Sequence, residues 1–344
     1  FVAKAYYGNE DLSTMDTVAT AFILLILVVF DPMAIIPLVS AVMFAVYGLL
    51  TRYAGRRDRT ATSFFWTGVT GAIGGEVVRL LAGADLRLDL RLLARDPSRA
   101  PDVDTDVRRC DYADHASGVE ALRGVDTLLM VSASEAADRR GQHRTFVEAA
   151  AEAGVRRIVY TSFAGAAEDA TFTLGRDHHD TEAAIRASGM EHTVLRDNFY
   201  LDVLPLFADH EGVIRGPAGD GRVAAVARAD VAAVAAAVLR DPAPHAGAAY
   251  ELSGPEALTM TEVAERAGRV LGRDLRFVDE TVEEAWASRR AAYPDAPDWQ
   301  LEAWVSTYTA IADGSCATVT DAIERITGRP ALSLEQTLER AREA

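Results

Sequence analysis

The amino-acid sequence predicts an α/β fold in which a doubly wound parallel sheet carries helices on both faces. Three observations predict it. Short apolar segments alternate with amphipathic ones from residue 62 onward, a glycine-rich turn follows the first of them, and 49% of the 344 side chains are hydrophobic. Strands that alternate with helices form parallel sheets with right-handed crossovers. We therefore expect a sheet-centred domain with a smaller C-terminal α/β part.

The expected strands are short apolar runs, and the expected helices lie between them. Strands are predicted at residues 63–66, 88–94, 127–131, 158–161 and 192–195, and helices at 74–81, 141–153 and 177–188. Beyond Arg196 the alternation loosens, and helices are expected to begin near Asp230, Thr259 and Ser333. The last two have the spacing of capping boxes, with Glu262 and Gln336 three residues later.

The first 60 residues form a separate apolar segment with a basic linker. Residues 18–50 are almost wholly apolar, interrupted by Asp31-Pro32 and Pro37, and four arginines follow within residues 52–59. The second apolar run has the length of one bilayer crossing, and the arginines fit a cytoplasmic flank. We expect a membrane anchor that holds a cytoplasmic domain at the inner face of the cell membrane. A short helical hairpin and a join in the gene model are the alternatives. The phrase VVFDPMAIIPL also resembles the first membrane segment of MarC-type membrane proteins.

Charge and cysteine content exclude several classes of protein. The formal net charge is −16, so the surface repels the phosphates of nucleic acids. Cys110 and Cys316 provide neither a disulfide framework nor a metal-ligand spacing, and we expect two buried thiols and no metal site. Lys4 is the only lysine in the chain.

The glycine-rich segment Thr67–Gly74 predicts a dinucleotide site. An apolar run precedes it and a helical pattern follows it directly. Gly68 would allow a tight turn, Gly71 would let the backbone approach a pyrophosphate, and Gly74 would bring the helix close to the sheet. The phosphates would bind to free amides at the helix N-terminus. A structural turn is the alternative, and the context favours a Rossmann-type cofactor domain.

The end of the second expected strand selects the cofactor. An acidic residue there binds the ribose 2′-hydroxyl of NAD, whereas a basic residue accepts the 2′-phosphate of NADP. The strand ends in Arg95-Asp96-Pro97, and a planar guanidinium suits bidentate contact with phosphate. Because Asp96 is acidic, NAD(H) is the lesser alternative as cofactor. The alternative for Arg95 is that it is a solvent-exposed turn residue with no role in cofactor binding. We predict NADP(H) over NAD(H).

Several segments share their order and spacing with a known family. They include VTGAIGG, LLARDPSRA, GVDTLLMVSASE, GQHRTFVEAAAEAGVRRIVYTS, HHDTEAAIRASGMEHTVLRDNFY and YELSGPEALTMTEVA. In these segments, over residues 62–342, the chain resembles the NmrA-like family of atypical short-chain dehydrogenase/reductases, and in particular its bacterial NAD(P)H:quinone oxidoreductases. The resemblance implies an NADP-binding core over residues 61–196. An interleaved substrate-binding part would occupy residues 197–344.

The resemblance also implies roles for individual residues. The pyrophosphate loop would be Gly68, Thr70, Gly71, Ala72, Ile73 and Gly74. Arg95 would bind the 2′-phosphate, Asp111 would lie beside the adenine, and Ser132, Ser134 and Thr161 would line the cofactor. Asn198, Phe199 and Tyr200 match the substrate-side loop, although Asp197-Asn198 stands where close relatives carry Asn-Gly.

Because Lys4 is the only lysine of the chain, the catalytic mechanisms open to the α/β domain are restricted. The usual short-chain dehydrogenases use Tyr-x-x-x-Lys, in which the lysine lowers the pKa of the tyrosine that transfers a proton. That pair cannot exist in this domain, which excludes alcohol dehydrogenation by the usual route and leaves quinone reduction open. The candidate catalytic residues are therefore His178, with His179 as its neighbour, Ser162 and Tyr200. The alternatives are capping or solvated histidines at a helix start and a packing role for Tyr200.

The sequence therefore predicts an NADPH-dependent reductase that transfers hydride to a quinone or a related conjugated carbonyl. The alternative is a regulatory protein that senses NADP(H) without turnover. The expected partners are a small-molecule substrate, a second copy of the chain in a homodimer, and a membrane surface contacted by residues 18–50.

Overall fold

The computed structural model describes residues 61–82, 89–101 and 105–343. The chain divides into two compact units, residues 1–62 and 63–344, and the second unit carries the elements discussed below. The membrane segment predicted at residues 18–50 lies outside the described residues. Among the helices that are described, none combines the length and apolarity needed to cross a bilayer.

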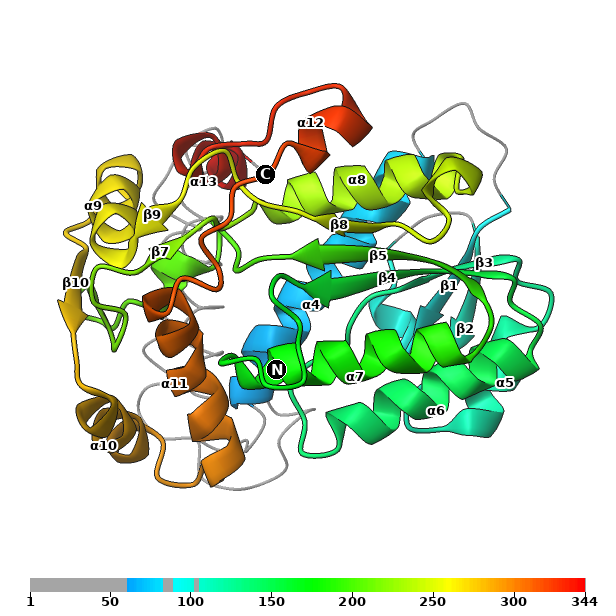
Figure 1. The fold of residues 1–344 in the computed structure, drawn as a ribbon, viewed down its shortest axis with the longest axis horizontal. Coiled ribbons are helices and arrows are strands. Elements are labelled where there is room, and N and C mark those ends of the chain that lie inside the picture. Colours follow the sequence, from blue (N-terminus) through cyan, green and yellow to red (C-terminus); the bar gives the residue numbers. More distant parts are fainter. Residues whose placement is uncertain (1–60, 83–88, 102–104, 344) are drawn as a thin grey trace, which may run out of the picture. The chain divides into compact units, whose positions relative to one another are not determined.

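Strands and helices alternate through the first part of this unit (Figure 1). The order is α4 (Ala61–Ala82), β1 (Arg91–Ala94), β2 (Asp106–Arg109), α5 (His115–Leu122), β3 (Thr127–Met130), α6 (Arg139–Glu152), β4 (Arg157–Phe163), α7 (Thr173–Ala187) and β5 (Glu191–Asp197). The strands predicted near residues 88–94, 127–131, 158–161 and 192–195 are confirmed, as are the helices predicted at 141–153 and 177–188.

The strands form two parallel sheets whose order is that of a dinucleotide-binding domain. β1 pairs with β2, and β3, β4, β5 and β8 (Ala249–Glu251) pair in that order, all in parallel. In the doubly wound order 3-2-1-4-5-6, the first strand lies between the second and the fourth. The position of that strand is the break between β1 and β3, where the described residues contribute no strand and the sheet is divided.

The predicted strand at residues 63–66 and the predicted turn at Thr67–Gly74 are both wrong in this structure, because α4 is one continuous helix over Ala61–Ala82. A four-residue apolar run fits a strand or a buried helix equally well by periodicity. No proline interrupts the segment, and glycine costs a helix only about 1 kcal/mol per residue. Amides inside a helix bond to carbonyls four residues earlier, so those of Gly68–Gly74 are not displayed as in a phosphate loop.

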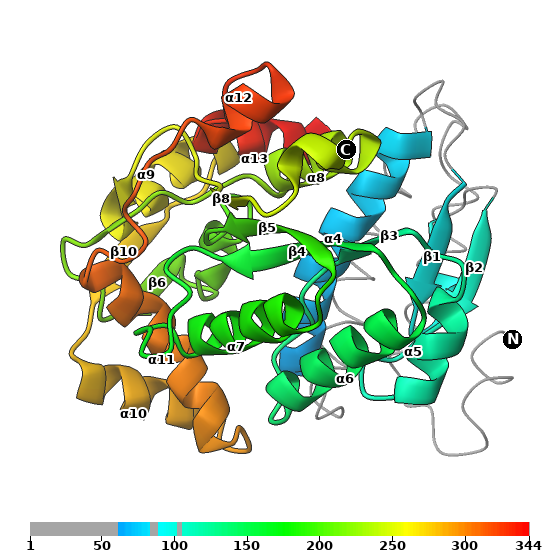
Figure 2. The same ribbon diagram turned by 45° about the vertical axis from the view of Figure 1, so that its right-hand side comes forward.

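Helices cover both faces of the four-stranded sheet (Figure 2). Ile158 and Tyr160 of β4 point into a core shared with α5, α6 and α7, whereas Val159 points into a core shared with α4 and α8 (Arg228–Arg240). Alternate residues of a strand face opposite sides, and burial on both sides explains the continuous apolar strands. Cys110 and Cys316 are buried free thiols, as predicted.

The C-terminal part combines short strands with the helices α9 to α13 (Figure 1). β6 (Val213–Gly216) pairs in parallel with β10 (Arg276–Asp279), and β7 (Arg222–Val223) pairs antiparallel with β9 (Leu258–Thr259). The helices are α9 (Met260–Leu271), α10 (Val282–Ala292), α11 (Asp298–Ala312), α12 (Ala322–Thr327) and α13 (Leu334–Glu343). The capping boxes predicted at Thr259 and Ser333 are confirmed, with both reciprocal bonds present in each.

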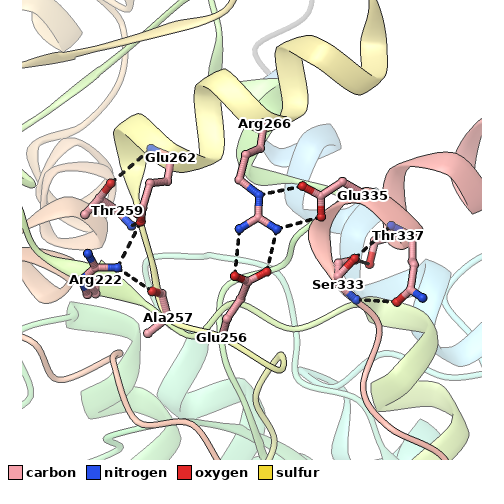
Figure 3. Close-up of polar contacts among 10 residues, drawn as sticks. Arg222, Glu256, Ala257, Thr259, Glu262, Arg266, Ser333, Glu335 and Thr337 are labelled. Carbon is pink, nitrogen blue, oxygen red and sulfur yellow. Dashed lines mark hydrogen bonds and ion pairs between the residues drawn. The ribbon is translucent and has the colours of Figure 1, made fainter.

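One arginine joins three segments of the C-terminal part (Figure 3). Arg266 of α9 donates through Nε and Nη2 to Glu335 of α13 at 2.6 and 2.8 Å, and through Nη1 and Nη2 to Glu256 at 2.8 and 2.7 Å. Hydrogen bonds from Arg266 lower the pKa of Glu335 to about 2. These two bidentate pairs attach the C-terminal helix to α9 and to the segment before β9.

We expect Arg266→Gln to lower the free energy of unfolding by about 1–2 kcal/mol, since charge-assisted bidentate pairs exceed ordinary surface pairs. Because the folded pKa of Glu335 is depressed, its contribution is present above about pH 4.5 and is lost as the pH falls toward 2. The difference between variant and wild type should therefore shrink in acid. Urea denaturation at pH 7 and pH 3 measures it. Arg269→Gln, an exposed change on the same helix, is the control; an equal loss in both variants would contradict the role of Arg266.

Candidate active site

A cavity lies at the carboxyl ends of β3 and β5. Three segments far apart in the sequence meet there: the loop after β3, the first turns of α7 and the segment after β5. The lining residues are Ser132, Ala133, Ser134, Glu135, Arg139, Phe172, Leu174, His178, Asp197, Asn198, Phe199, Tyr200, Val203, Leu204 and Phe207. Ligands of open α/β sheets bind outside the carboxyl ends of the strands, so this is the position expected for chemistry.

The loop after β3 is held by three side chains from two elements, β4 and α6. The Ser132 amide donates to Thr161 Oγ1 at 2.9 Å, and the Ala133 amide donates to His143 Nε2 at 2.9 Å. Arg139 Nε donates to the Ala133 carbonyl at 2.9 Å. The backbone of the cavity wall at residues 132–134 is therefore fixed, and Thr161 contributes by accepting the hydrogen bond of the Ser132 amide.

His143 has a defined tautomer. Since the Ala133 amide can only donate, Nε2 accepts and Nδ1 carries the proton, which it donates to Thr181 Oγ1 at 2.8 Å. Thr181 in turn donates to the Asp177 carbonyl at 2.8 Å. The ring is fully buried, and burial together with the charge of Arg139 holds the pKa of His143 well below 6.5. His143 of α6 is thus a neutral side chain whose hydrogen bonds connect α6 to α7 and to the loop after β3.

His178 lies in the second turn of α7 rather than at a helix start, and the side chain is buried. Arg139 Nη2 lies 3.1 Å from Nε2, and the Tyr160 hydroxyl lies 2.8 Å from Nδ1. Arginine can only donate, so Nε2 accepts and Nδ1 donates to Tyr160. Burial lowers the pKa of His178 well below 6.5, assisted by the charge of Arg139. Both ring nitrogens are occupied, so the ring has no N–H to offer a substrate.

Ser162 is placed behind the sheet edge and outside the cavity lining. Its hydroxyl donates to Glu182 Oε1 at 2.6 Å, and Arg196 donates to both oxygens of Glu182 at 2.9 and 2.8 Å. Burial alone would raise the pKa of Glu182, but the bonds from Arg196 and Ser162 outweigh it and lower the pKa. Ser162 therefore belongs to an ion-pair network between β4, β5 and α7.

The segment after β5 supplies the opposite wall. The Tyr200 hydroxyl donates to Asp197 Oδ2 at 2.5 Å. Asn198 Nδ2 donates to the Cys316 carbonyl at 3.0 Å, and Asn198 Oδ1 accepts from the Phe199 amide at 2.8 Å. Asn198 is thus a structural anchor of the wall, whereas Tyr200 and Asp197 face the cavity.

Two buried groups beside the cavity have polar atoms without a hydrogen-bond partner among the described residues. They are Arg139 Nη1, whose nearest carboxylate oxygen is Asp177 Oδ2 at 3.6 Å, and Glu135 Oε2. Glu135 Oε1 accepts from Gln300 and Trp304 of α11, and burial raises the pKa of Glu135 against these bonds. A ligand that offers both a donor and an acceptor would satisfy both groups.

The second end of the expected cofactor site lies where β1 and β2 end. Arg95 follows β1 and Asp111 follows β2, and the Cys110 amide donates to the Ala94 carbonyl at 3.0 Å. Both side chains are exposed, so they fit the adenosine end of a dinucleotide along this edge. Asp96 Oδ1 accepts from the Ser98 amide and hydroxyl at 3.1 and 2.7 Å, which commits that carboxylate to a local turn.

The predicted site residues therefore divide into four groups. Six line one cavity: Ser132, Ser134, His178, Asn198, Phe199 and Tyr200. Thr161 supports the cavity wall through the Ser132 amide, whereas Ser162 bonds to Glu182 outside the lining. Arg95 and Asp111 follow β1 and β2, and the last group lies in α4: Gly68, Thr70, Gly71, Ala72, Ile73 and Gly74. Ile73 is buried in the core with Val159 and Leu195. The phosphate-binding role of the α4 residues stays a prediction.

Four residues of the site were missed in the sequence: Glu135, Arg139, His143 and Asp197. A signal existed for two of them. His143 shares a helix face with Phe146 and Val147, which predicts burial, and Asp197 departs from the Asn-Gly of close relatives. Arg139 and Glu135 resemble ordinary surface charges in the sequence.

The strand order and the cavity at the carboxyl ends of the strands define the class, which is a dinucleotide-binding oxidoreductase. A protein family described as NAD(P)H-binding matches residues 68–242. The chain belongs to this family, in its NmrA-like branch.

Among the relatives that match most of the chain are two bacterial oxidoreductases. A (4-alkanoyl-5-oxo-2,5-dihydrofuran-3-yl)methyl phosphate reductase of Streptomyces griseus is 38% identical over 77% of this chain and 93% of its own length. Quinone oxidoreductase 2 of Escherichia coli is 32% identical over 79% of this chain and 96% of its own length. Among solved structures, an NADPH-dependent quinone oxidoreductase of Escherichia coli complexed with NADPH superimposes with a TM-score of 0.71 at 30% identity. That superposition covers 80% of this chain and 98% of the other.

Proposed function

We propose that the chain reduces a quinone or a related conjugated carbonyl with NADPH. The observation that carries the proposal is the cavity at the carboxyl ends of β3 and β5, lined by a hydroxyl, a carboxyl and a guanidinium group. The relatives support the substrate class, because one is named for quinones and another for an unsaturated lactone, which is a conjugated carbonyl. When bound, NADPH supplies a hydride, that is, two electrons and one hydrogen nucleus.

The choice of NADP(H) over NAD(H) rests on the end of β1. Arg95 is exposed there, while Asp96 bonds to Ser98 and caps the short helix Pro97–Arg99. A carboxylate committed to a cap competes poorly for the ribose 2′-hydroxyl, whereas a guanidinium suits a 2′-phosphate.

In this proposal Arg139 binds the substrate oxygen. Its buried guanidinium lines the cavity and carries an N–H without a hydrogen-bond partner among the described residues. A fixed positive group in a site shielded from water stabilises negative charge that develops on oxygen during reduction. His178 then acts as a positioning residue, since Nε2 bonds to Arg139 and its only N–H, at Nδ1, is donated to Tyr160.

An assay of the full chain with NADPH tests the proposal. We expect NADPH oxidation with benzoquinones, naphthoquinones or an alkanoyl-substituted unsaturated lactone, and slower oxidation of NADH. NADPH binding without oxidation of any of these substrates would instead support the alternative function, a protein that senses NADP(H).

The membrane contact predicted for residues 18–50 and the predicted homodimer remain predictions. Cosedimentation of the full chain with membranes tests the first, and the mass of the particle in solution tests the second.

A further inference from the structure

The pair formed by Asp197 and Tyr200 is the starting point. Asp197 is the last residue of β5, is 4% exposed and lines the cavity beside Tyr200. Tyr200 Oη lies 2.5 Å from Asp197 Oδ2. The backbone of Tyr200 is held by a bridge to Val226, and the Leu201 amide donates to the Val226 carbonyl at 3.0 Å, so the pair has a fixed geometry.

The surroundings of the pair are mostly apolar. Phe163, Phe172 and Phe199 form an aromatic cluster beside it, with ring centroids 4.7–5.1 Å apart. The charged and titratable groups that face the pair are Arg139 from α6, neutral His178 from α7, Glu135 at the cavity, and the ion pair of Asp202 with Arg228 from α8. Arg139, which also forms an ion pair with Asp177 at 3.6 Å, is the positive group whose charge acts on Asp197.

This environment keeps a proton on the pair at neutral pH. Burial raises the pKa of Asp197 to about 8, although the hydrogen bond from Tyr200 and the charge of Arg139 both lower it. Burial and the adjacent carboxylate raise the pKa of Tyr200 well above 10. A bare tyrosinate is therefore strongly disfavoured, and Tyr200 can give up its proton only if it receives another at the same time.

We propose that Asp197 is the proton reserve of the site: it passes its carboxyl proton to Tyr200 Oη as Tyr200 passes its hydroxyl proton to the reduced substrate. Tyr200 donates in the 2.5 Å contact when Asp197 is a carboxylate; when Asp197 is protonated, its carboxyl donates to Tyr200 Oη instead, which leaves the Tyr200 hydroxyl proton for the substrate oxygen. The inference rests on the proposed reduction of a quinone or conjugated carbonyl. Hydride addition leaves one negative charge on a substrate oxygen. That oxygen gains the proton of Tyr200, the O–H bond of Asp197 breaks, and Asp197 remains as a carboxylate. Solvent returns one proton after the product leaves, so each turnover consumes one hydride and one proton.

Asp197→Asn and Tyr200→Phe test the relay, with exposed Asp169→Asn as the matched control. Asparagine keeps the shape of Asp197 but has no acidic proton. We expect kcat/KM of the wild type to fall as the pH rises through about 8. Asp197→Asn should lower it about tenfold at pH 7 and abolish that fall, because a positioned acid contributes 10²-fold or more and a quinone needs less than full assistance.

The double variant gives a second criterion. If the two residues act in series, Asp197→Asn combined with Tyr200→Phe should be no slower than the slower single variant. Multiplied effects, or wild-type rate and pH profile in Asp197→Asn, would overturn the relay. Tyr200→Phe alone still decides the question if Asp197→Asn does not fold, since it too should lose the fall near pH 8.

Infrared spectroscopy separates the relay from the proposed function. The wild type should show the absorption of a protonated carboxyl at pH 6 that disappears by pH 10 and is absent in Asp197→Asn, with or without turnover. An ionised Asp197 at pH 6 would overturn the relay even in an active enzyme. The chain could also show a protonated Asp197 and yet oxidise no NADPH with any substrate. That result would overturn the proposed reductase function and the relay with it, and would leave only the finding that the pair holds a proton.

Discussion

Arg95→Ala is expected to weaken NADPH binding about 50-fold while leaving NADH binding almost unchanged. A charge-assisted contact with phosphate contributes about 2–3 kcal/mol, and every 1.4 kcal/mol is a factor of ten in affinity. Arg95 is exposed directly after β1, and its charge reaches Tyr112, whose pKa it lowers against the rise caused by burial. The guanidinium therefore lies at the edge where the adenosine end of the cofactor is expected.

Dissociation constants from fluorescence titration with NADPH and with NADH measure this effect. NADH serves as the internal control because it lacks the 2′-phosphate. Arg95→Lys should give an intermediate loss, since lysine keeps the charge and loses the planar fork. Equal weakening for both cofactors would assign Arg95 a structural role, and unchanged NADPH affinity would remove the 2′-phosphate assignment.

His143→Ala is expected to lower the free energy of unfolding by about 3–4 kcal/mol. The change leaves the Ala133 amide and the Thr181 hydroxyl without their buried partner and opens a cavity in a fully buried site. An unsatisfied buried group costs about 1–3 kcal/mol, and the cavity adds to that loss. The loop at Ser132–Ser134 should also loosen, so substrate binding should weaken in the variant.

We also expect the stability contributed by His143 to depend on pH. The folded pKa values of His143 and His178 are depressed below 6.5, so the unfolded chain binds more protons below that pH. Stability is therefore full above about pH 6.5 and falls as the pH drops below it. His143→Ala should reduce the slope of this fall, which thermal unfolding between pH 5 and 8 would reveal.

His179→Ala is the matched control for this prediction. His179 adjoins His178 on α7 but is only partly buried, and a substitution there should change stability by about 0.5 kcal/mol or less. If His143→Ala unfolds at the same temperature as His179→Ala, the hydrogen bonds of His143 to the loop after β3 and to α7 do not contribute to stability.

The parts of the fold that the sequence predicted are those with strong local patterns. β3, β4 and β5 each contain a short apolar run, at residues 128–130, 158–160 and 194–195, where the strand is largely buried, and α6 and α7 have helical periodicity. β2 was not predicted, because its sequence Asp-Val-Arg-Arg is mostly polar and partly exposed at the edge of its sheet. The segment before Gly68 was predicted as a strand, and four apolar residues cannot distinguish a strand from the helix α4.

In the candidate site too, local pattern predicted the positions of some residues, whereas their contacts depend on the tertiary structure. The structure brings Tyr200, Asn198 and Ser132 to one cavity, since residues just after parallel strands meet at one edge, while their roles toward cofactor and substrate stay predictions. The roles within the site were not predictable. Ser162 turned out to bond to Glu182, and His178 turned out to be neutral between Arg139 and Tyr160. A role depends on what a side chain contacts, and these contacts join residues 18–39 positions apart.

The sequence by itself determined the α/β class, the preference for NADP(H) as cofactor and the exclusion of a tyrosine–lysine pair, because each depends on local pattern or on residue types alone; the role of Arg95 in that preference stays a prediction. Only the tertiary structure decided which polar groups are neutral, which lack partners and which hold a proton. Those properties arise from burial and from hydrogen bonds between distant segments. Asp197 is one residue of a strand in the sequence, and it holds a proton only because the folded chain removes water from it, against the opposing effects of Tyr200 and Arg139.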